Sequence, residues 1–183
     1  MKRIFFLIAI LVFNSADIYA QKNYTKNGHV SFFSKAAMEN IKAENNQVLT
    51  VLDTKTGEMQ FSILIKSFHF PKSLMEVHFN ENYLESDKFP TAGFKGSITN
   101  LKDILFTKDG IYKATVSGAM SIHGVTQKFN TSGTITVTGN KISIRSIFFI
   151  KLADYNISIP KIVMDKVAES VEITIHSELD QKL

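Results

Sequence analysis

The chain has 183 residues, of which 44% are hydrophobic, and a formal net charge of +4. It contains no cysteine, which excludes disulfide bonds and the acyl anchor that exported bacterial lipoproteins carry on a cysteine at the cleavage point. Its basic residues are scattered singly among apolar ones, so we expect a solvated charged surface and no nucleic-acid partner.

The first twenty residues have the three parts of a secretory signal peptide. Two cations precede the apolar run Ile4–Phe13, and the small residue Ala20 marks the expected cleavage point, with Ala16 as the alternative. A run of this length forms about 15 Å of helix, roughly half the thickness of a bilayer core, so we expect no stable membrane insertion. We therefore predict a signal peptide at residues 1–20 and a single periplasmic or secreted domain at residues 21–183.

Most of the mature region alternates apolar and polar residues with a period of two, which is typical of half-buried β-strands. The clearest strands are predicted at residues 59–66, 112–122, 128–137, 142–152 and 171–179, with shorter candidates near 29–34, 47–53 and 92–100. Turn signals include Asn27-Gly28, Thr56-Gly57, Asp109-Gly110 and Gly139-Asn140. Eight antiparallel strands of this kind form either a barrel around one small ligand or a two-sheet sandwich, and periodicity leaves both open.

Three segments break the alternation and are predicted to be short helices. Residues 35–43 are rich in good helix formers, and residues 71–84 contain a capping-box pattern from Ser73 to Glu76. Residues 160–168 place Pro160 near a first helical turn. Helices inserted between barrel strands usually cover or plug an opening, so we expect these segments at one end of the fold.

Two stretches of the chain carry a family resemblance. The first is Glu76–Pro90, which is followed by Phe94-Lys95-Gly96, and the second is Val116–Thr126, which is similar to the strand and turn G-x-L-x-I-H/R-G-V-T. Together with Leu52-Asp53 and Gly57, these stretches resemble the YceI-like family over residues 28–179. The chain departs from the family pattern R-x-D-[FY]-G, where it has Leu152-Ala153-Asp154-Tyr155-Asn156.

The resemblance implies an exported lipocalin-like barrel that encloses a polyisoprenoid, such as an isoprenoid quinone or a polyprenyl phosphate. The predicted fold is accordingly all-β, an eight-stranded antiparallel lipocalin-like barrel with two or three short helices. We expect a carrier or sequestering protein for a long apolar ligand, polyisoprenoid or fatty, and not an enzyme. No cofactor or metal ion is expected, because the five histidines show no metal-ligand spacing.

The chain is rich in phenylalanine, with 15 Phe and no Trp, and several of these rings alternate toward the predicted interior. Large rings mixed with small residues such as Gly96 and Gly133 can leave a tunnel for a flexible apolar chain. The residues predicted to line it are Phe32, Phe61, Ile63, Ile65, Phe94, Tyr112, Val116, Met120, Phe129, Ile135, Ile144 and Phe148.

Two other functions stay open at this level. A structural or interaction protein would have a barrel filled by its own side chains, whereas an internal cavity on the order of several hundred Å³ would favour binding. An enzyme would need His78 or His123 within reach of an acid in the pocket. We interpret His78 as a helix-end residue and His123 as a structural turn contact. The acidic residues Glu81 and Glu85 are interpreted as solvated.

Overall fold

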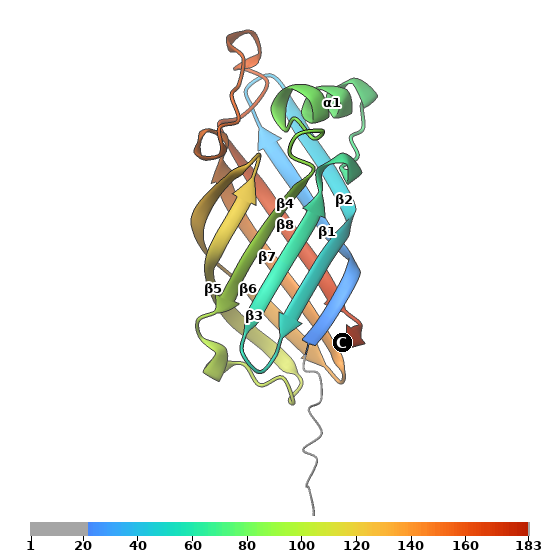
Figure 1. The fold of residues 1–183 in the computed structure, drawn as a ribbon, viewed down its shortest axis with the longest axis vertical. Coiled ribbons are helices and arrows are strands. Elements are labelled where there is room, and N and C mark those ends of the chain that lie inside the picture. Colours follow the sequence, from blue (N-terminus) through green and yellow to red (C-terminus); the bar gives the residue numbers. More distant parts are fainter. Residues whose placement is uncertain (1–21, 183) are drawn as a thin grey trace, which may run out of the picture.

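The computed structural model describes residues 22–182, and eight antiparallel strands there close into a barrel (Figure 1). The predicted signal peptide lies outside the described residues. The strands are β1 (Lys22–Lys35), β2 (Asn40–Asp53), β3 (Glu58–Leu64), β4 (Thr91–Ile98), β5 (Gly110–Ile122), β6 (Val125–Thr138), β7 (Lys141–Lys151) and β8 (Ser170–Leu179). Consecutive strands pair, β8 pairs with β1, and the short β9 (Gln181–Lys182) extends the pairing of β1.

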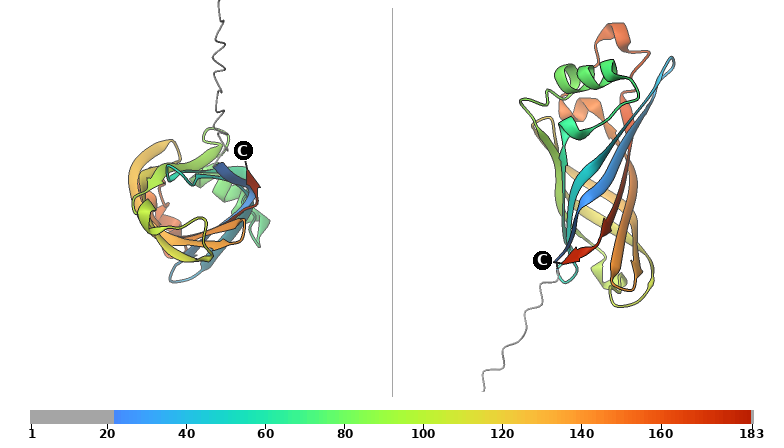
Figure 2. Two further views of the ribbon diagram at one scale, coloured as in Figure 1. Left: turned by 90° about the horizontal axis from the view of Figure 1, so that it is seen from below. Right: turned by 90° about the vertical axis from the view of Figure 1, so that its right-hand side faces the viewer.

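The strands form a closed ring when the molecule is seen from below (Figure 2), which confirms the predicted barrel and excludes the sandwich. All eight predicted strands are present. One predicted turn is wrong, because Asn27-Gly28 lies inside β1, where the pairing with β2 shifts register. A Cβ at Gly28 would come within 2.6 Å of the Ser177 hydroxyl oxygen. Glycine is therefore needed at this position because the strands approach each other closely there.

The predicted helix at residues 35–43 is also wrong, because these residues close the hairpin between β1 and β2. Lys35 pairs with Asn40 across its tip, so the cross-strand ladder overrides the local helix propensity. The helix predicted at residues 71–84 is confirmed as α1 (Ser73–His78), which continues into the π-helical turn η2 (Phe79–Tyr83). Its capping box is absent, since Ser73 makes no cap and Glu76 Oε2 accepts from the Phe70 backbone N–H. The helix predicted at residues 160–168 is wrong, because these residues form a single 3-10 turn, η5 (Lys161–Val163), followed by turns.

The barrel interior has two different halves. The lower half, near the β2–β3 and β6–β7 turns and the C-terminus, is filled by side chains that are almost completely buried: Val48, Leu52, Ile135, Val137 and Leu179. One polar pair lies among them, with Thr50 Oγ1 and Ser177 Oγ 2.7 Å apart. At the upper end, α1 and the segments around residues 152–169 lie over the mouth of the barrel (Figure 1). We call α1, η2 with the residues next to them, and the segments around residues 152–169 the cap, and this end of the barrel the capped end.

Candidate functional site: an apolar cavity under the cap

A cavity of about 500 Å³ occupies the upper half of the barrel. The wall that the strands supply is apolar except for Ser34, at the upper end of β1. The other strand residues that line it are Val30, Phe32, Ile41, Phe61, Ile63, Ala92, Gly93, Phe94, Met120, Ile122, Phe148, Ile150, Val171, Ile173 and Ile175. This volume lies within the range of about 300–1,000 Å³ that is typical of ligand pockets, so the barrel is not filled by its own side chains.

Four phenylalanine rings hold the cap on the barrel. Phe79, in η2, packs against Phe32 of β1 and against Phe68 and Phe70, with ring centroids 5.0–5.5 Å apart. The strand-like segment that leads to α1 is itself bonded to β2, because the backbones of Glu44 and His69 exchange two hydrogen bonds. The roof of the cavity is therefore built from aromatic contacts between segments that are distant in sequence.

His123 connects the β5–β6 turn of the barrel to the other side of the cap. The His123 ring lies at the β5–β6 turn, with Nε2 2.8 Å from Glu85 Oε2 and Nδ1 3.2 Å from the Tyr155 carbonyl oxygen. Both partners are acceptors, so the ring donates to both only as the imidazolium. The ring also packs edge-on against Phe89, 4.7 Å away between centroids. The structure thus agrees with a structural turn contact for His123.

Among the described residues, the polar side chains that line the cavity, including Ser34 of β1, lie at the capped end. Glu39 comes from the β1–β2 hairpin, Lys72 and His78 from α1 and its preceding residue, and Lys166 from the segment after η5. Lys72 Nζ donates to Glu39 Oε1 at 2.7 Å, and this hydrogen bond lowers the pKa of the Glu39 carboxyl. Tyr83 also lines the cavity, and burial raises the pKa of its hydroxyl.

A partition of side chains closes the cavity below. A second space of about 50 Å³ lies in the lower barrel, and five residues line both spaces: Phe61, Phe94, Met120, Phe148 and Ile175. The Phe129 ring braces this partition from beneath, with its centroid 4.8 Å from that of Phe148 and 6.2 Å from that of Phe94. Aromatic rings therefore set the depth of the main cavity.

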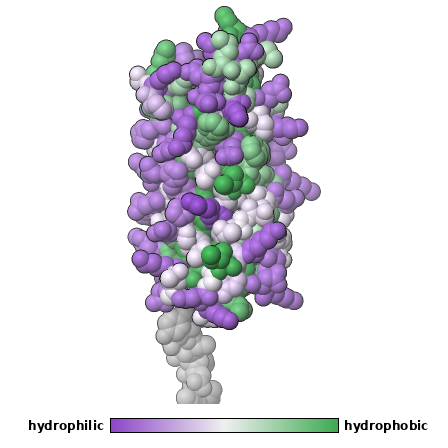
Figure 3. Space-filling view, turned by 180° about the vertical axis from the view of Figure 1, so that it is seen from behind, coloured by the Kyte–Doolittle hydropathy of each residue, from purple (hydrophilic) through white to green (hydrophobic). Residues whose placement is uncertain are grey.

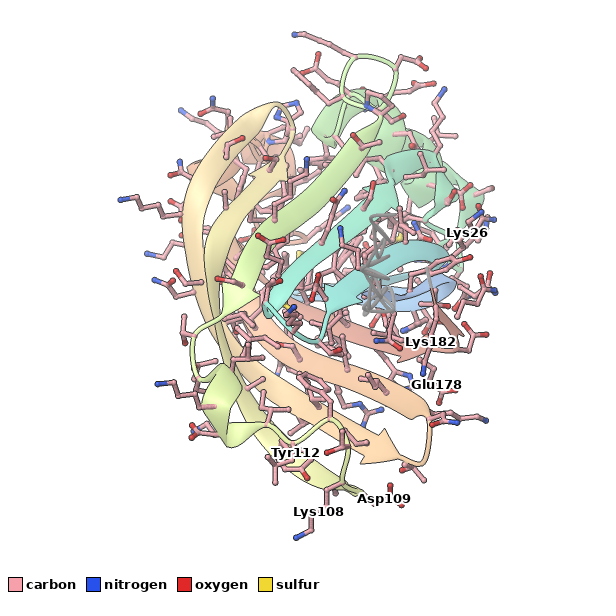
Figure 4. The ribbon with its side chains drawn as sticks, turned by 60° about the horizontal axis from the view of Figure 1, so that its bottom comes forward. Lys26, Lys108, Asp109, Tyr112, Glu178 and Lys182 are labelled. Carbon is pink, nitrogen blue, oxygen red and sulfur yellow. The ribbon has the colours of Figure 1, made fainter. Side chains whose placement is uncertain are left out.

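Most of the residues predicted to line the tunnel face one of these two spaces. Seven line the main cavity: Phe32, Phe61, Ile63, Ile65, Phe94, Met120 and Phe148. Four line only the lower space: Val116, Phe129, Ile135 and Ile144. Tyr112 lines neither, since it lies at the lower end of the barrel near Lys108 and Asp109 (Figure 4), where its hydroxyl donates to the Lys108 carbonyl oxygen. Contact of these residues with a ligand stays a prediction.

The roof of the cavity is not among the predicted site residues. It contains Phe68 and Phe70, whose alternation around His69, close before α1, is the pattern of a short extended segment. Leu152, at the position where the family pattern has arginine, is buried and lines the cavity, so the wall stays apolar there. Asn156 takes the position of the family's glycine with a φ of 56°, a left-handed conformation that asparagine tolerates.

His123 lies within hydrogen-bond reach of Glu85, but neither residue lines the cavity. In the described part of the chain, no three His, Cys, Asp or Glu side chains are grouped as metal ligands. His78 contacts the Asn82 amide of its own helix, with the two nitrogens 3.1 Å apart. None of the described helices is both long enough and apolar enough to cross a membrane.

Comparison with known proteins assigns the domain. A family model described as the YceI-like domain matches residues 22–179. A search among curated proteins found no match.

Solved structures with the same fold come from several bacteria. A polyisoprenoid binding domain from Saccharophagus degradans, described as implicated in plant cell wall breakdown, is 15% identical with a TM-score of 0.74, covering 86% of this chain and 96% of its own. BcnA of Burkholderia cenocepacia is 18% identical with a TM-score of 0.67, covering 81% and 94%. The YceI protein of Campylobacter jejuni is 15% identical with a TM-score of 0.56, covering 100% and 94%. At these identities, the likeness establishes the fold.

Proposed function

The chain belongs to the YceI-like family, and on that premise we propose that it is an exported protein that holds a long apolar lipid inside its barrel. The lipid is a polyisoprenoid or a chain of similar length and flexibility, and the protein acts as its carrier or sequesters it. The observation that carries this proposal is the cavity of about 500 Å³, whose strand wall is almost entirely apolar and whose polar lining groups, among the described residues, lie at its capped end. The Saccharophagus degradans neighbour, described as a polyisoprenoid binding domain, supports the same class of ligand.

The energetics of the cavity fit such a ligand. Burying apolar surface is worth about 25 cal/mol per Å², so an isoprenoid tail gains affinity along its whole length without any charged contact. The rings and branched side chains of the wall provide contact surface without hydrogen-bonding groups, which matches a methyl-branched hydrocarbon. A polar head would remain beside Glu39, Lys72 and Lys166, where water is accessible.

The same geometry supports a binding protein over an enzyme. The titratable side chains that line the main cavity, Glu39, Lys72, His78, Tyr83 and Lys166, come from the segments at its capped end, and no other described residue of its lining is titratable. A general acid or base would have to reach the middle of an apolar chain from that end, which lies outside hydrogen-bond reach. We also propose that residues 1–20 are a cleaved leader and that residues 21–183 form one periplasmic or secreted domain.

The proposal is tested on protein purified from the periplasm of an expressing bacterium. Native mass spectrometry and solvent extraction are expected to find an apolar lipid bound to the folded chain. Adding a polyprenyl ligand to delipidated protein is expected to raise its Tm, because a ligand that binds only the folded state stabilises it by mass action. If no lipid co-purifies and no polyprenyl ligand raises the Tm, the proposal is wrong.

A pair of variants separates cavity binding from surface binding. Ala92→Phe introduces a ring into the main cavity from β4, whereas Ala119→Phe adds the same ring to the alternate, outward face of β5. We expect Ala92→Phe to lower lipid occupancy at least about tenfold by occupying the space that the ligand needs. Ala119→Phe should keep the occupancy of the original protein. Equal occupancy in the two variants would place the lipid outside the barrel.

A further inference from the structure

Exposed hydrophobic side chains gather around the mouth of the cavity. Met38 at the β1–β2 hairpin tip is 72% exposed, Leu74 and Val77 of α1 are 64% and 45% exposed, and Ile162 and Met164 are 90% and 53% exposed. We call these five residues the tip surface. They come from three separate elements, and hydrophobic atoms are visible at the extreme upper end of the molecule (Figure 3). A group of exposed hydrophobic side chains gathered at one end of a molecule is typical of an interaction site.

Hydrogen bonds hold these elements together at the capped end. The Met38 backbone N–H donates to the Asp165 carbonyl oxygen at 2.9 Å, and the Ala168 backbone N–H donates to Ser34 Oγ at 2.9 Å. The hairpin tip and the segment that carries Ile162 are therefore joined, and the tip surface does not depend on chance proximity of loose loops.

The tip surface is continuous with the interior. Leu74 is both exposed and part of the cavity lining, and Val163, between the two exposed residues Ile162 and Met164, also lines the cavity. An apolar surface therefore runs from the outside of the cap into the barrel. When another apolar phase covers the tip surface, a lipid that moves along this apolar surface stays in contact with hydrocarbon groups from that phase to the cavity.

The charges beside the tip surface suit an anionic partner. The hairpin tip, α1 with the residue before it and the segment 160–168 carry four lysines, Lys35, Lys72, Lys161 and Lys166, and three acids, Glu39, Glu76 and Asp165, for a sum of +1. Glu39 is paired with Lys72, and Glu76 accepts a backbone hydrogen bond from Phe70. Lys35 and Lys161 make no ion pair within the described residues, so they are available to phosphate groups. Lys166 lies near Glu39, and its charge contributes to lowering the pKa of that carboxyl.

We propose that the tip surface docks on a lipid bilayer that contains anionic lipid, with the cavity mouth facing the bilayer. Ile162 and Met164 enter the interfacial region, and the neighbouring lysines contact the phosphates. This inference rests on the proposed function, since a bilayer is the apolar phase from which a long lipid reaches the cavity without crossing water. The attachment is peripheral and reversible.

The absence of tryptophan from the chain allows a direct test with single tryptophan reporters. Ile162→Trp places one on the tip surface, and Ile111→Trp places a control on the lower end of β5, where the native side chain is 76% exposed. Mature protein, with removal of the leader verified by mass, is mixed with phosphatidylcholine–phosphatidylglycerol vesicles. We expect emission from Trp at position 162 to shift to the blue and to be quenched by brominated lipid, with no change at position 111. No change at either position, or a change at position 111 alone, overturns the proposal.

Charge and apolar variants test the two parts of the contact. The double variant Ile162→Glu/Met164→Glu should weaken vesicle binding at least about tenfold while native mass spectrometry still finds bound lipid. Lys161→Gln/Lys166→Gln should weaken binding to anionic vesicles by roughly fivefold or more. Undiminished vesicle binding by the first double variant contradicts the proposal. A protein that carries lipid but ignores vesicles disproves the docking alone, whereas one that binds vesicles but never carries lipid disproves the proposed function.

Discussion

Gly124 and Gly139 both lie at hairpin turns with positive φ, at 75° and 56°, but their surroundings differ. A Cβ at Gly124 would overlap the ring of Phe89, whereas a Cβ at Gly139 would meet nothing within 4 Å. The first glycine is required by conformation and by space, and the second by conformation alone. The Phe89 ring packs closely against Gly124 and also contacts the His123 ring. The β5–β6 turn is therefore part of the contact that attaches the cap to the barrel.

We predict that Gly124→Ala destabilises the protein more than Gly139→Ala. The cost of a left-handed alanine is about 1–2 kcal/mol and is common to both variants. Overlap with Phe89 should add a further 1–3 kcal/mol or so at position 124, as overpacking does in protein cores. Urea unfolding of both variants measures the difference. Equal losses would show that Phe89 moves aside freely.

Glu39 controls the charge at the cavity mouth. The hydrogen bond from Lys72 lowers the pKa of the Glu39 carboxyl, so the carboxylate is ionised at neutral pH and neutralises one lysine. Because the folded-state pKa is the lower one, this contact is intact above the ordinary pKa of glutamate and is lost as the pH falls through the lowered value.

Glu39→Gln should therefore strengthen binding to anionic vesicles. The change frees one positive charge at the tip, and a lysine near an anionic surface contributes about 1 kcal/mol, or roughly fivefold in affinity. Glu58→Gln makes the same chemical change at the start of β3, at the lower end of the barrel, and should leave vesicle binding unaltered. The idea fails if both variants respond alike in a flotation assay at low salt.

At the scale of elements, the cap is attached by side-chain contacts together with the isolated β-bridge between Glu44 and His69. α1 is only six residues long and buries none of them, so isolated helix stability cannot hold it. Phe79 in η2 contributes instead, through three ring contacts that involve both the barrel and the preceding segment. The fastening of Glu85 to His123 completes the attachment at the far end of the cap.

Phe79→Ala should loosen the cap without unfolding the barrel. Removing this partly buried ring is expected to cost about 2–4 kcal/mol of stability. Hydrogen exchange of residues 73–83 should become faster, while exchange in β5 and β6 stays slow. Val77→Ala, on the exposed side of α1, is the matched control and should leave both nearly unchanged. Uniform acceleration across the barrel in Phe79→Ala would mean that the cap and the barrel unfold as one unit.

For the molecule as a whole, the division of the interior matters most. The lower barrel is filled by aliphatic side chains, the upper barrel is hollow, and aromatic rings form the partition between them. A filled lower half stabilises the fold independently of cargo. A hollow upper half gives up packing contacts that a ligand can restore, which links ligand occupancy to stability.

Adjacent phenylalanines of β7 provide a test of this division. Phe148 faces the interior and borders both spaces, whereas Phe149 is 64% exposed on the outer wall. Phe148→Ala should cost about 3–5 kcal/mol in lipid-free protein and should join the two spaces. Native mass spectrometry is then expected to find longer lipids in Phe148→Ala and an unchanged lipid profile in Phe149→Ala. An unchanged profile in both would show that the partition does not limit ligand length.

The amino-acid sequence by itself determined the number of barrel strands, most of the residues that face the interior and the Gly139 hairpin. These depend on local rules, because a period of two assigns each side chain to one face and turn residues end each strand. Predictions from local rules were wrong where contacts between distant residues dominate. The β1–β2 pairing replaces the helix predicted at residues 35–43, and Asn27-Gly28 forms a bulge and not a turn.

Only the tertiary structure decided whether the barrel is hollow. Phe61, Ile135 and Tyr112 all alternate inward in the sequence, yet they lie in the cavity wall, the filled lower half and the lower rim, respectively. Periodicity states that a side chain points inward, but not what it meets across the barrel. That depends on strand stagger, on the width of the ring at each level and on the cap that closes one end, all of which are set by contacts between distant parts of the chain.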